Sequence, residues 1–293
     1  MYLIELDKAG AEWVIVAHLS NDANMLEVLE QNKSPHIVTG SLISGAPEEF
    51  VEMESKLVGN HTDPVTIEEL REPFKKLIEP EWFMPRIFSI RQMGKKSNHG
   101  LNYNMKYKRF ALENEIEEGV AKKIVTLYRE VAYPDITKWH TSIENQLRED
   151  RTLINLFGRK RRFLDGWGPE LFDQAFAFIP QSSVFDLTRV GMVQTYNDPS
   201  LDMYQLLAQV HDSLLYQAPI TDTKKVAQDL ITIGLEYMNP TLEANSREFT
   251  VDTTVKIGLD WGSMWECDLS HDPEKTALSI DKVLENIHGK EAA

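Results

Sequence analysis

The chain has 293 residues, of which 42% are hydrophobic and 26% charged, a composition that excludes a disordered protein and indicates a folded globular one. No stretch approaches the roughly 20 apolar residues that a membrane-spanning helix needs. The lone cysteine, Cys267, excludes an intrachain disulfide and fits a reducing, cytoplasmic compartment. The formal net charge of −15, taken alone, argues against a nucleic-acid partner.

The first half of the chain predicts two short strands followed by a largely helical region. The predicted elements are a strand at 2–7, a strand at 12–19 that runs into a helix at 21–29, short helices joined by turns at 34–83, one or two helices at 85–110, and helices at 113–150 interrupted at Pro134. Prolines and glycines set the turns between 34 and 83, because both residues interrupt regular structure.

The second half returns to strands. The predicted elements are a hairpin at 153–164 around Gly158, a helix at 182–196, two strands at 204–218 that meet at His211-Asp212, a helix at 223–238, a strand at 248–259 and a helix at 277–287. Strands on both sides of a long helical insert predict an α+β fold, a sheet domain with an inserted helical subdomain. We expect the tail at 270–293 to be a peripheral addition.

Basic residues are concentrated in two places despite the negative net charge. Residues 82–112 contain no acidic side chain, and a second basic run follows Gly158. The basic residues of the two runs are Arg86, Arg91, Lys95, Lys96, Lys106, Lys108, Arg109, Arg159, Lys160, Arg161 and Arg162. A single charged run is usually a solvated face, but two runs interleaved with aromatic residues favour a polyanionic partner.

Three groups of residues have the chemistry of a reactive site. Asp7 ends the first predicted strand and is followed by Glu12 and His18. Arg91, Lys95, His99 and Tyr103 recur in steps of four, which places them in one stripe on a helix flanked by Gly94 and Gly100. Gln209, His211 and Asp212 close a predicted strand end.

Each group alone is more often structural, since an aspartate at a strand end is usually a cap and spaced cations usually face solvent. Together they fit phosphoryl transfer, which uses two carboxylates from separate strands to hold a pair of divalent cations roughly 3.5–4 Å apart. Asp7 and Asp212 are the candidate carboxylates. Arg91 and Lys95 are the candidate clamp for a polyphosphate, whose charge spreads over its oxygens during transfer.

These residues resemble the motifs of family A DNA polymerases. Asp7 to Ser20 resembles motif A, D-Y-S-Q-I-E-L-R-V-L-A-H-L-S, without a gap, and Arg91 to Tyr103 resembles motif B, R-x-x-x-K-x-x-N-F-G-x-x-Y. Gln209-Val-His-Asp212 resembles motif C. Weaker similarities are found at Pro35–Thr39, Thr152–Arg161, Ile179–Ser182 and Val255–Trp265, so the resemblance covers about residues 3–266.

The resemblance implies a right-hand polymerase, with palm at 1–30 (motif A) and 184–269 (motif C), helical fingers at 31–183 (motif B), and a tail at 270–293. It implies two Mg²⁺ ions, with Mn²⁺ as an alternative, and primer–template DNA and dNTPs as partners. In the implied site, Asp7 and Asp212 hold the metals, Lys95 acts in catalysis, and Arg91, Lys95 and His36 contact the triphosphate. His99 lies near the sugar and base, and Glu12, supported by Tyr103, is the steric gate against a ribose 2′-OH. The implied DNA contacts are Gln209 and His211 on the primer end and Gln181 and Arg161 on the duplex.

Several positions depart from the family pattern. Residues 8–11 replace Tyr-Ser-Gln-Ile, His99 replaces an aromatic residue, Asn104 replaces a glycine, and Ser213 replaces an acidic residue. None of these departures removes a metal carboxylate or a phosphate cation. Nucleotide selectivity is the property they put in question.

Motif A begins at residue 7, so the thumb, the exonuclease-like domain and the first palm strands expected of the family are absent from this sequence. Either the gene is split, with a second polypeptide that supplies these parts, or the sequence is a fragment. We expect a natural split, phage-like and active in the host cytoplasm. The strand at 2–7 would then lack neighbours and leave a sheet edge exposed.

Two other interpretations stay open. A single-subunit RNA polymerase relative shares the layout, although Glu12 argues against ribonucleotides. A catalytically inactive DNA-binding subunit is the alternative outside enzymes. The joint presence of Asp7, Asp212, Arg91 and Lys95 argues against it, because a binding role does not need all four.

Overall fold

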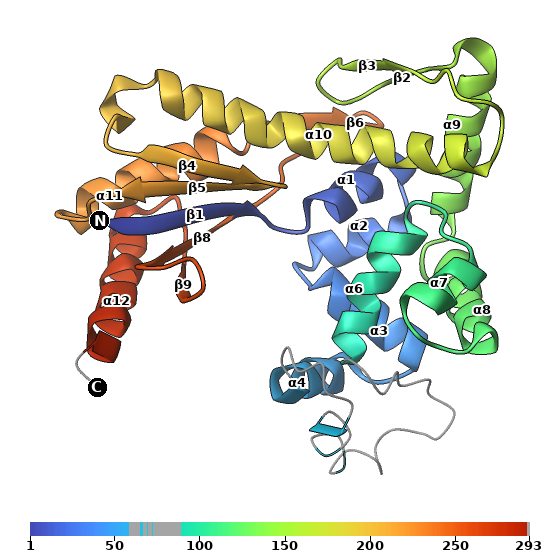
Figure 1. Cartoon of the computed structure of the whole chain (residues 1–293), viewed down its shortest axis with the longest axis horizontal. Coiled ribbons are helices and arrows are strands. Elements are labelled where there is room, and N and C mark those ends of the chain that lie inside the picture. The colour runs from blue at the N-terminus through green and yellow to red at the C-terminus, as the bar shows by residue number, and fades with distance from the viewer. Residues whose placement is uncertain (59–64, 67–68, 70–71, 73–88, 292–293) are drawn as a thin grey trace. The chain divides into compact units, whose positions relative to one another are not determined.

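In this computed structural model the chain forms two compact units, each assembled from separate stretches of sequence (Figure 1). The structure describes residues 1–58, 65–66, 69, 72 and 89–291. One unit, here called the sheet unit, contains residues 1–12, 154–159 and 180–293, and the other, the helical unit, contains 13–153 and 160–179. The chain therefore leaves the sheet after its first strand and returns to it after a long helical insertion, which confirms the predicted α+β fold.

The sheet unit is organised around β1, the first strand. Its sheet, among the described residues, has five antiparallel strands in the order β4-β5-β1-β8-β9. Their bounds are β1 (Tyr2–Lys8), β4 (Gln205–Val210), β5 (Ser213–Ala218), β8 (Thr253–Gly258) and β9 (Met264–Cys267). The prediction of an exposed edge at residues 2–7 is wrong, because β5 and β8 pair with β1 on both sides (Figure 1).

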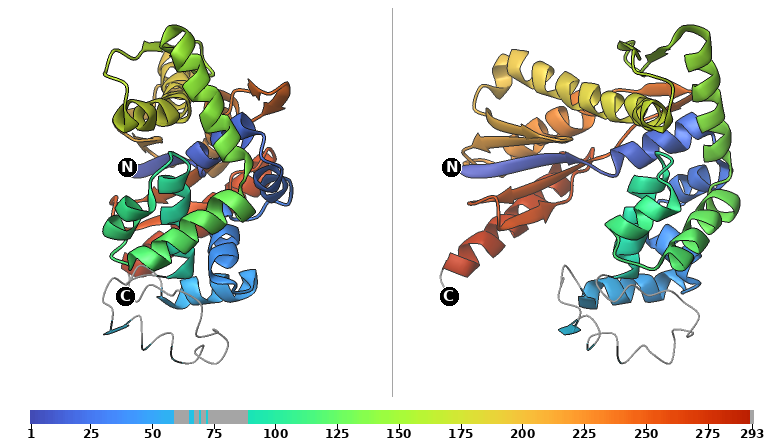
Figure 2. Two further views of the ribbon diagram at one scale, coloured as in Figure 1. Left: turned by 90° about the vertical axis from the view of Figure 1, so that its right-hand side faces the viewer. Right: turned by 45° about the vertical axis from the view of Figure 1, so that its right-hand side comes forward.

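Helices α11 (Thr223–Ile231) and α12 (Pro273–Glu291) pack against each other in the sheet unit (Figures 1 and 2). A π-helical turn, η4 (Thr232–Tyr237), extends α11. The apolar side of α12 is buried in the core through Ala277, Ile280, Val283 and Ile287. The expectation of a peripheral tail is therefore wrong, because these side chains complete the core beside β9.

The remaining elements of the sheet unit are small, apart from one long helix. They are η3 (Pro199–Leu201), the hairpin of β6 (Leu242–Ala244) and β7 (Arg247–Phe249), and residues 180–197 of α10 (Pro169–Asn197). The strand predicted at 248–259 is thus divided between β7 and β8.

The helical unit packs its helices around a large aromatic and aliphatic core. Its elements are α1 (Ala11–Ser20), α2 (Ala23–Glu30), α3 (Pro35–Ser44), α4 (Glu48–Val58), α6 (Ile90–Leu101), α7 (Tyr107–Glu113), α8 (Glu118–Leu127), η2 (Tyr128–Ala132) and α9 (Asp135–Asp150). Helices α3, α4 and α6 lie side by side (Figure 2). Tyr128 and Tyr133 are completely buried in the core, with their rings edge to face.

Two predicted elements differ in the structure. Residues 12–19 are helical and not a strand, because the apolar run Trp13–Ala17 buries several sides of α1, and a short continuous apolar run has no periodicity that separates strand from helix. Helix α10 begins at Pro169, well before the predicted start at residue 182, and continues through Pro180. An interior proline normally marks a helix boundary, so the sequence did not predict a helix that continues through Pro180.

The predicted hairpin around Gly158 is confirmed, with β2 (Thr152–Ile154) pairing with β3 (Lys160–Arg162). Gly158 takes φ 79°, in the left-handed region that glycine adopts without strain. At the hairpin tip, Arg159 grips the buried carboxylate of Asp186 on α10 with two hydrogen bonds of 2.8 and 2.5 Å. The tip is thereby fixed to α10. No described helix is long and apolar enough to cross a membrane.

Candidate active site

Two carboxylates stand at one end of the sheet. Asp7 lies opposite Ser213, the first residue of β5, in the register of the two strands. Asp212 directly precedes Ser213, in the two-residue turn between β4 and β5. His211 makes this tight turn with φ 53°, a conformation that histidine adopts more readily than most residues with a side chain. The register therefore brings Asp7 and Asp212 to the same end of neighbouring strands.

The surroundings of Asp7 disfavour the ionised form of its carboxyl group. Burial, followed by the charges of Asp212 and Glu5, raises the pKa of Asp7 to about 6, and Lys256 partly opposes this rise. In the part of the chain that the structure describes, no three or more His, Cys, Asp or Glu side chains form a metal-binding group. The pair still fits Mg²⁺, because this ion prefers oxygen ligands and takes one or two carboxylates with water and substrate phosphates.

Asp7→Asn is expected to stabilise the metal-free fold at alkaline pH. The raised pKa of Asp7 means that its contribution to stability is fully present below the ordinary value of 3.8 and is lost as pH rises through about 6. We expect a gain on the order of 1 kcal/mol at pH 8 after allowing for solvent screening, and none below about pH 4. Urea unfolding in a chelator measures this gain in the free energy of unfolding. A wild type more stable than the variant at pH 8 would contradict the raised pKa of Asp7.

Lys8, the residue after Asp7, is buried with only 2% of its surface exposed. Its ammonium group donates to the Val251 carbonyl at 2.6 Å, to Thr253 Oγ1 at 2.9 Å and to Asn239 Oδ1. Burial lowers the pKa of Lys8 to about 7, against the opposing charges of Asp252 and Asp212. These hydrogen bonds tie the end of β1 to the start of β8, and so fix the backbone that carries Asp7.

A second cluster lies on helices α3 and α6 of the helical unit. A Cβ atom on Gly94 of α6 would come within 2.1 Å of the His36 carbonyl oxygen in α3. A Cβ on Gly40 of α3 would come within 2.9 Å of the Ile90 carbonyl oxygen in α6. The two helix backbones are therefore in direct contact, which is possible only because both positions lack a side chain.

The predicted stripe on α6 is correct for three of its four members. Arg91, Lys95 and His99 follow each other at i, i+4 and i+8 within α6, with Lys95 and His99 exposed. The helix ends at Leu101, so Tyr103 lies in the following turn and outside the stripe. The other basic residue singled out just upstream, Arg86, lies outside the described residues.

His36 of α3 adjoins this stripe, with its ring centroid 6.2 Å from that of His99. Burial, followed by the charges of Arg91, His99 and Lys95, lowers the pKa of His36 to about 3. The imidazole is therefore neutral at physiological pH. The cluster combines two fixed cations with a neutral hydrogen-bonding ring, which suits an anion with several oxygens.

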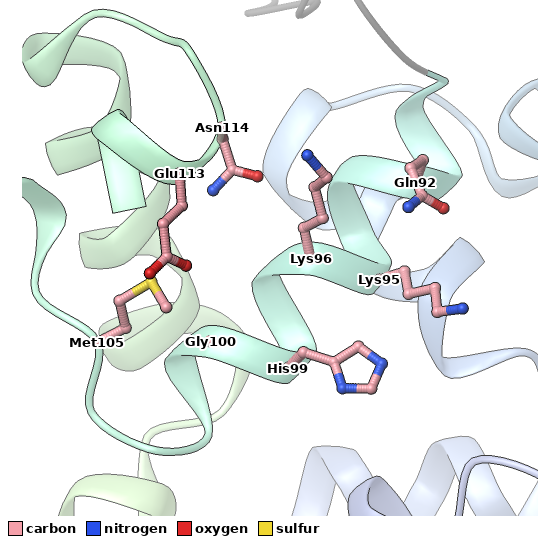
Figure 3. A pocket seen from close by; sticks show the side chains of 8 residues that line it. All are labelled: Gln92, Lys95, Lys96, His99, Gly100, Met105, Glu113 and Asn114. Carbon is pink, nitrogen blue, oxygen red and sulfur yellow. The ribbon is translucent and has the colours of Figure 1, made fainter. Parts of the chain in front are cut away.

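Figure 3 shows that the two sides of α6 differ in chemistry. Lys95 and His99 point away from Glu113 and Asn114, whereas Lys96 projects from α6 between these two groups. A cavity of about 280 Å³ is lined by residues from both sides of α6. Its lining residues are Gln92, Lys95, Lys96, His99, Gly100, Met105, Glu113 and Asn114 (Figure 3). Glu113 also pairs with Arg109 at 2.7 Å. The part of the cavity beside Glu113 therefore carries mixed charge and is less suited to a polyanion than the stripe of Arg91, Lys95 and His99.

The candidate gate, Glu12, is the second residue of α1 and is partly buried, as is Tyr103 in the turn after α6. The support of Glu12 by Tyr103 stays a prediction. On α10, Gln181 is exposed. Its role on the duplex stays a prediction as well.

The remaining candidates for DNA contact lie on hairpins. Gln209 donates to the His211 carbonyl oxygen at 3.4 Å, and the His211 side chain is exposed. Arg161 is exposed on β3, stacks 4.6 Å from the Phe163 ring and donates to Gln174 Oε1 at 2.5 Å. The Arg159 guanidinium, by contrast, is held by Asp186 and serves the fold.

Two residues that organise these clusters were not among the predicted site residues. Lys8 was noted only as a departure from motif A, although a lysine inside an apolar strand pattern signals a buried cation that must find acceptors. Asn98 of motif B contacts His36 on α3 through a hydrogen bond of 3.1 Å. No local sequence pattern predicts that contact, because the two residues are 62 positions apart.

The sequence and the fold were compared with known proteins. DNA polymerase I from Thermus caldophilus is 26% identical over 273 residues, and that from Treponema pallidum is 26% identical over 269 residues. These alignments cover 88% and 89% of this chain but 27% and 23% of the relatives, so the chain spans about a quarter of their length.

A similar solved structure is the POL domain of Pol1 from M. smegmatis in complex with DNA primer–template and dNTP. It superposes with a TM-score of 0.66 at 20% sequence identity, covering 89% of this chain and 40% of that one. This similarity supports the fold. The profile of DNA polymerase family A matches residues 87–266, more than half of the chain. On this match the chain belongs to DNA polymerase family A, as the three sequence motifs predicted.

Proposed function

We propose that this chain is the catalytic portion of a DNA-directed DNA polymerase that adds dNTPs to a primer 3′-OH by two-metal phosphoryl transfer. The observation that carries the proposal is the pair of Asp7 and Asp212 at the shared end of β1 and β5, in a chain of polymerase family A. Asp7 and Asp212 would hold two Mg²⁺ ions, or Mn²⁺. Such ions activate the attacking oxygen and stabilise the charge on the transferring phosphate.

The cluster on α3 and α6 would bind the triphosphate of the incoming nucleotide. Phosphoryl transfer depends on positioning and on neutralising charge spread over the phosphate oxygens. Arg91 and Lys95 of α6 supply two positive charges, and Lys95 is the catalytic cation. His36 of α3 adds a neutral imidazole ring. His99 would lie near the sugar and base.

The domain assignment follows from these roles. We propose palm at residues 1–30 and 184–269 and fingers at 31–183, with residues 270–293 as a C-terminal segment whose helix α12 packs into the core of the sheet unit. Gln209 and His211 would contact the primer end, and Gln181 and Arg161 the duplex. The relative from M. smegmatis was solved with primer–template and dNTP, which supports the same partners for this chain.

Glu12→Ala is expected to admit ribonucleotides. A carboxylate in the space of the 2′-OH excludes a ribose by steric overlap and by an unpaired charge, so its truncation should lower the dNTP-to-NTP preference by about tenfold or more. Primer extension with each nucleotide measures this preference. Glu30→Ala, on the exposed end of α2, is the control. An unchanged ratio in Glu12→Ala would remove Glu12 as the gate, and a wild-type preference for NTPs would favour an RNA polymerase instead.

The chain alone is expected to bind primer–template weakly and to need a second polypeptide for tight binding. Its net charge of −15 opposes a phosphate backbone, whose affinity rests on neutralisation by Lys and Arg. Among the described residues β4 pairs only with β5, and Leu206 and Leu207 on it are 42% and 50% exposed. A partner strand added at this edge would cover these side chains, in an interface of roughly 2,000 Å² or more.

Fluorescence anisotropy with labelled primer–template, together with light scattering of the purified chain, tests this expectation. We expect weak, salt-sensitive binding and self-association through apolar surface. Tight binding by a monodisperse monomer would defeat the need for a partner, while leaving the roles of Asp7 and Asp212 intact.

A further inference from the structure

The side chain of Asn98 is buried, with 1% of its surface exposed, between α6 and the start of α3. Its Nδ2 atom donates to the Pro35 carbonyl oxygen at 3.3 Å and lies 3.1 Å from His36 Nδ1. Its Oδ1 atom accepts from the Thr39 hydroxyl at 2.9 Å and lies 3.1 Å from the Tyr128 hydroxyl. Every polar atom of the amide is therefore engaged.

These partners fix the orientation of the amide. A carbonyl oxygen can only accept a hydrogen bond, so the NH₂ group must face Pro35. The hydroxyls of Thr39 and Tyr128 can donate to the oxygen on the other side. Turning the amide over would set Oδ1 against the Pro35 carbonyl oxygen, with two like dipoles in contact in a buried site, which is costly.

The orientation of the amide determines the protonation of His36. With one Nδ2 hydrogen directed at Pro35, the other is directed at His36 Nδ1. That nitrogen must therefore be an acceptor without a proton, and in a neutral imidazole the proton then resides on Nε2. The groups that face the ring from α6 are Arg91, Lys95 and His99, and their charges oppose a second proton.

We propose that Asn98 is a positioning residue that locks His36 in its Nε2–H form, so that His36 donates a neutral hydrogen bond to an oxygen of the bound triphosphate. The proposal rests on the proposed function in one respect, the identity of the anion. Arg91 and Lys95 provide the charge, and a third full charge beside them would raise the repulsion within the cluster. A neutral donor of fixed direction adds a hydrogen bond without this cost.

The ¹⁵N spectrum of the wild-type chain labelled at histidine tests the tautomer without any variant. The His36 resonances are assigned as those lost in His36→Gln, among the eight histidines of the chain. We expect an unprotonated Nδ1 and a protonated Nε2 between pH 5 and 8, since the pKa of His36 lies near 3. A proton on Nδ1, or conversion to imidazolium within this range, would overturn the proposal.

Asn98→Asp tests the positioning role. The carboxylate replaces the donor that faces Nδ1 by an acceptor, so the His36 proton should move to Nδ1. Affinity for inorganic triphosphate and for a dNTP should fall by about fivefold or more, as expected for a lost hydrogen bond. Asn102→Asp is the matched control, because Asn102 contacts the same Tyr128 hydroxyl at 2.7 Å and no hydrogen bond joins its side chain to His36.

The outcomes separate the two hypotheses. If wild-type His36 carries its proton on Nε2 but the chain binds no triphosphate, the proposed function fails and the tautomer assignment stands. Equal losses of affinity in Asn98→Asp and Asn102→Asp, with the Nε2–H form retained in both, would show that the buried network is merely structural and would overturn the proposal. If Asn98→Asp does not fold, the wild-type spectrum alone decides.

Discussion

Asp7→Asn and Asp212→Asn are each expected to lower the rate of single-nucleotide addition by about three orders of magnitude or more, because a lost metal ligand removes both activation of the 3′-OH and stabilisation of charge on the phosphate. The measurement is single-turnover extension with the chain in molar excess over primer–template, so that weak DNA affinity does not limit the rate. Neither change removes core volume, and Asp7→Asn removes a charge whose burial, together with the nearby charges of Asp212 and Glu5, raises the pKa of Asp7 to about 6.

Asp252→Asn is the matched control for both carboxylate variants. Asp252 is an exposed aspartate just before β8, and its backbone carbonyl accepts a hydrogen bond from Ala9 at 2.9 Å, so it lies at the same end of the sheet. Its side chain has no proposed role with the metal ions, and we expect an extension rate within about twofold of wild type. Near-normal extension by Asp7→Asn or Asp212→Asn would show that the replaced carboxylate is not a ligand of the catalytic metal ions.

Gly94→Ala is expected to abolish measurable triphosphate binding by the helical unit. The new Cβ would lie 2.1 Å from the His36 carbonyl oxygen and 2.7 Å from the Gly40 nitrogen, both backbone atoms that no side-chain rotation can move. Helices α3 and α6 must separate, which costs roughly 1–3 kcal/mol or more and displaces His36 from the stripe. Calorimetric titration with a dNTP and thermal unfolding measure the two effects.

Gly119→Ala is the matched control for Gly94→Ala. Gly119 is also helical, in α8, but a Cβ there would meet no atom within 4 Å. Alanine has the higher helix propensity, so this variant should be as stable as wild type or more stable by up to about 1 kcal/mol, with unchanged dNTP affinity. Undiminished dNTP binding in Gly94→Ala would contradict the role of the close helix contact.

The sequence predicted the elements whose signals are local. The alternation of apolar and polar residues predicted β1, and the turn residues His211-Asp212 predicted the β4–β5 hairpin. Gly158 predicted the hairpin of β2 and β3. Each depends on residues a few positions apart. The family resemblance likewise depended on short motifs in order, and the comparisons confirmed it.

The sequence could not predict features that depend on distant contacts. The acceptors of Lys8 lie 231 to 245 positions away, and they exist only once β8 has paired with β1. The same pairing placed β1 inside the sheet, where an exposed edge was expected. Helix α12 joined the core because β9 and α11 offered it an apolar surface that its own sequence does not reveal.

The most direct test of polymerase activity is template-directed addition by the unmodified chain. A labelled primer is annealed to four templates that differ in the next base, and each is mixed with excess chain, one dNTP at a time, and Mg²⁺ or Mn²⁺, with anisotropy confirming that the DNA is bound. We expect addition of the complementary dNTP on each template and none in a chelator. No addition on fully bound primer–template, with either metal, would contradict this expectation and leave a DNA-binding subunit without catalysis.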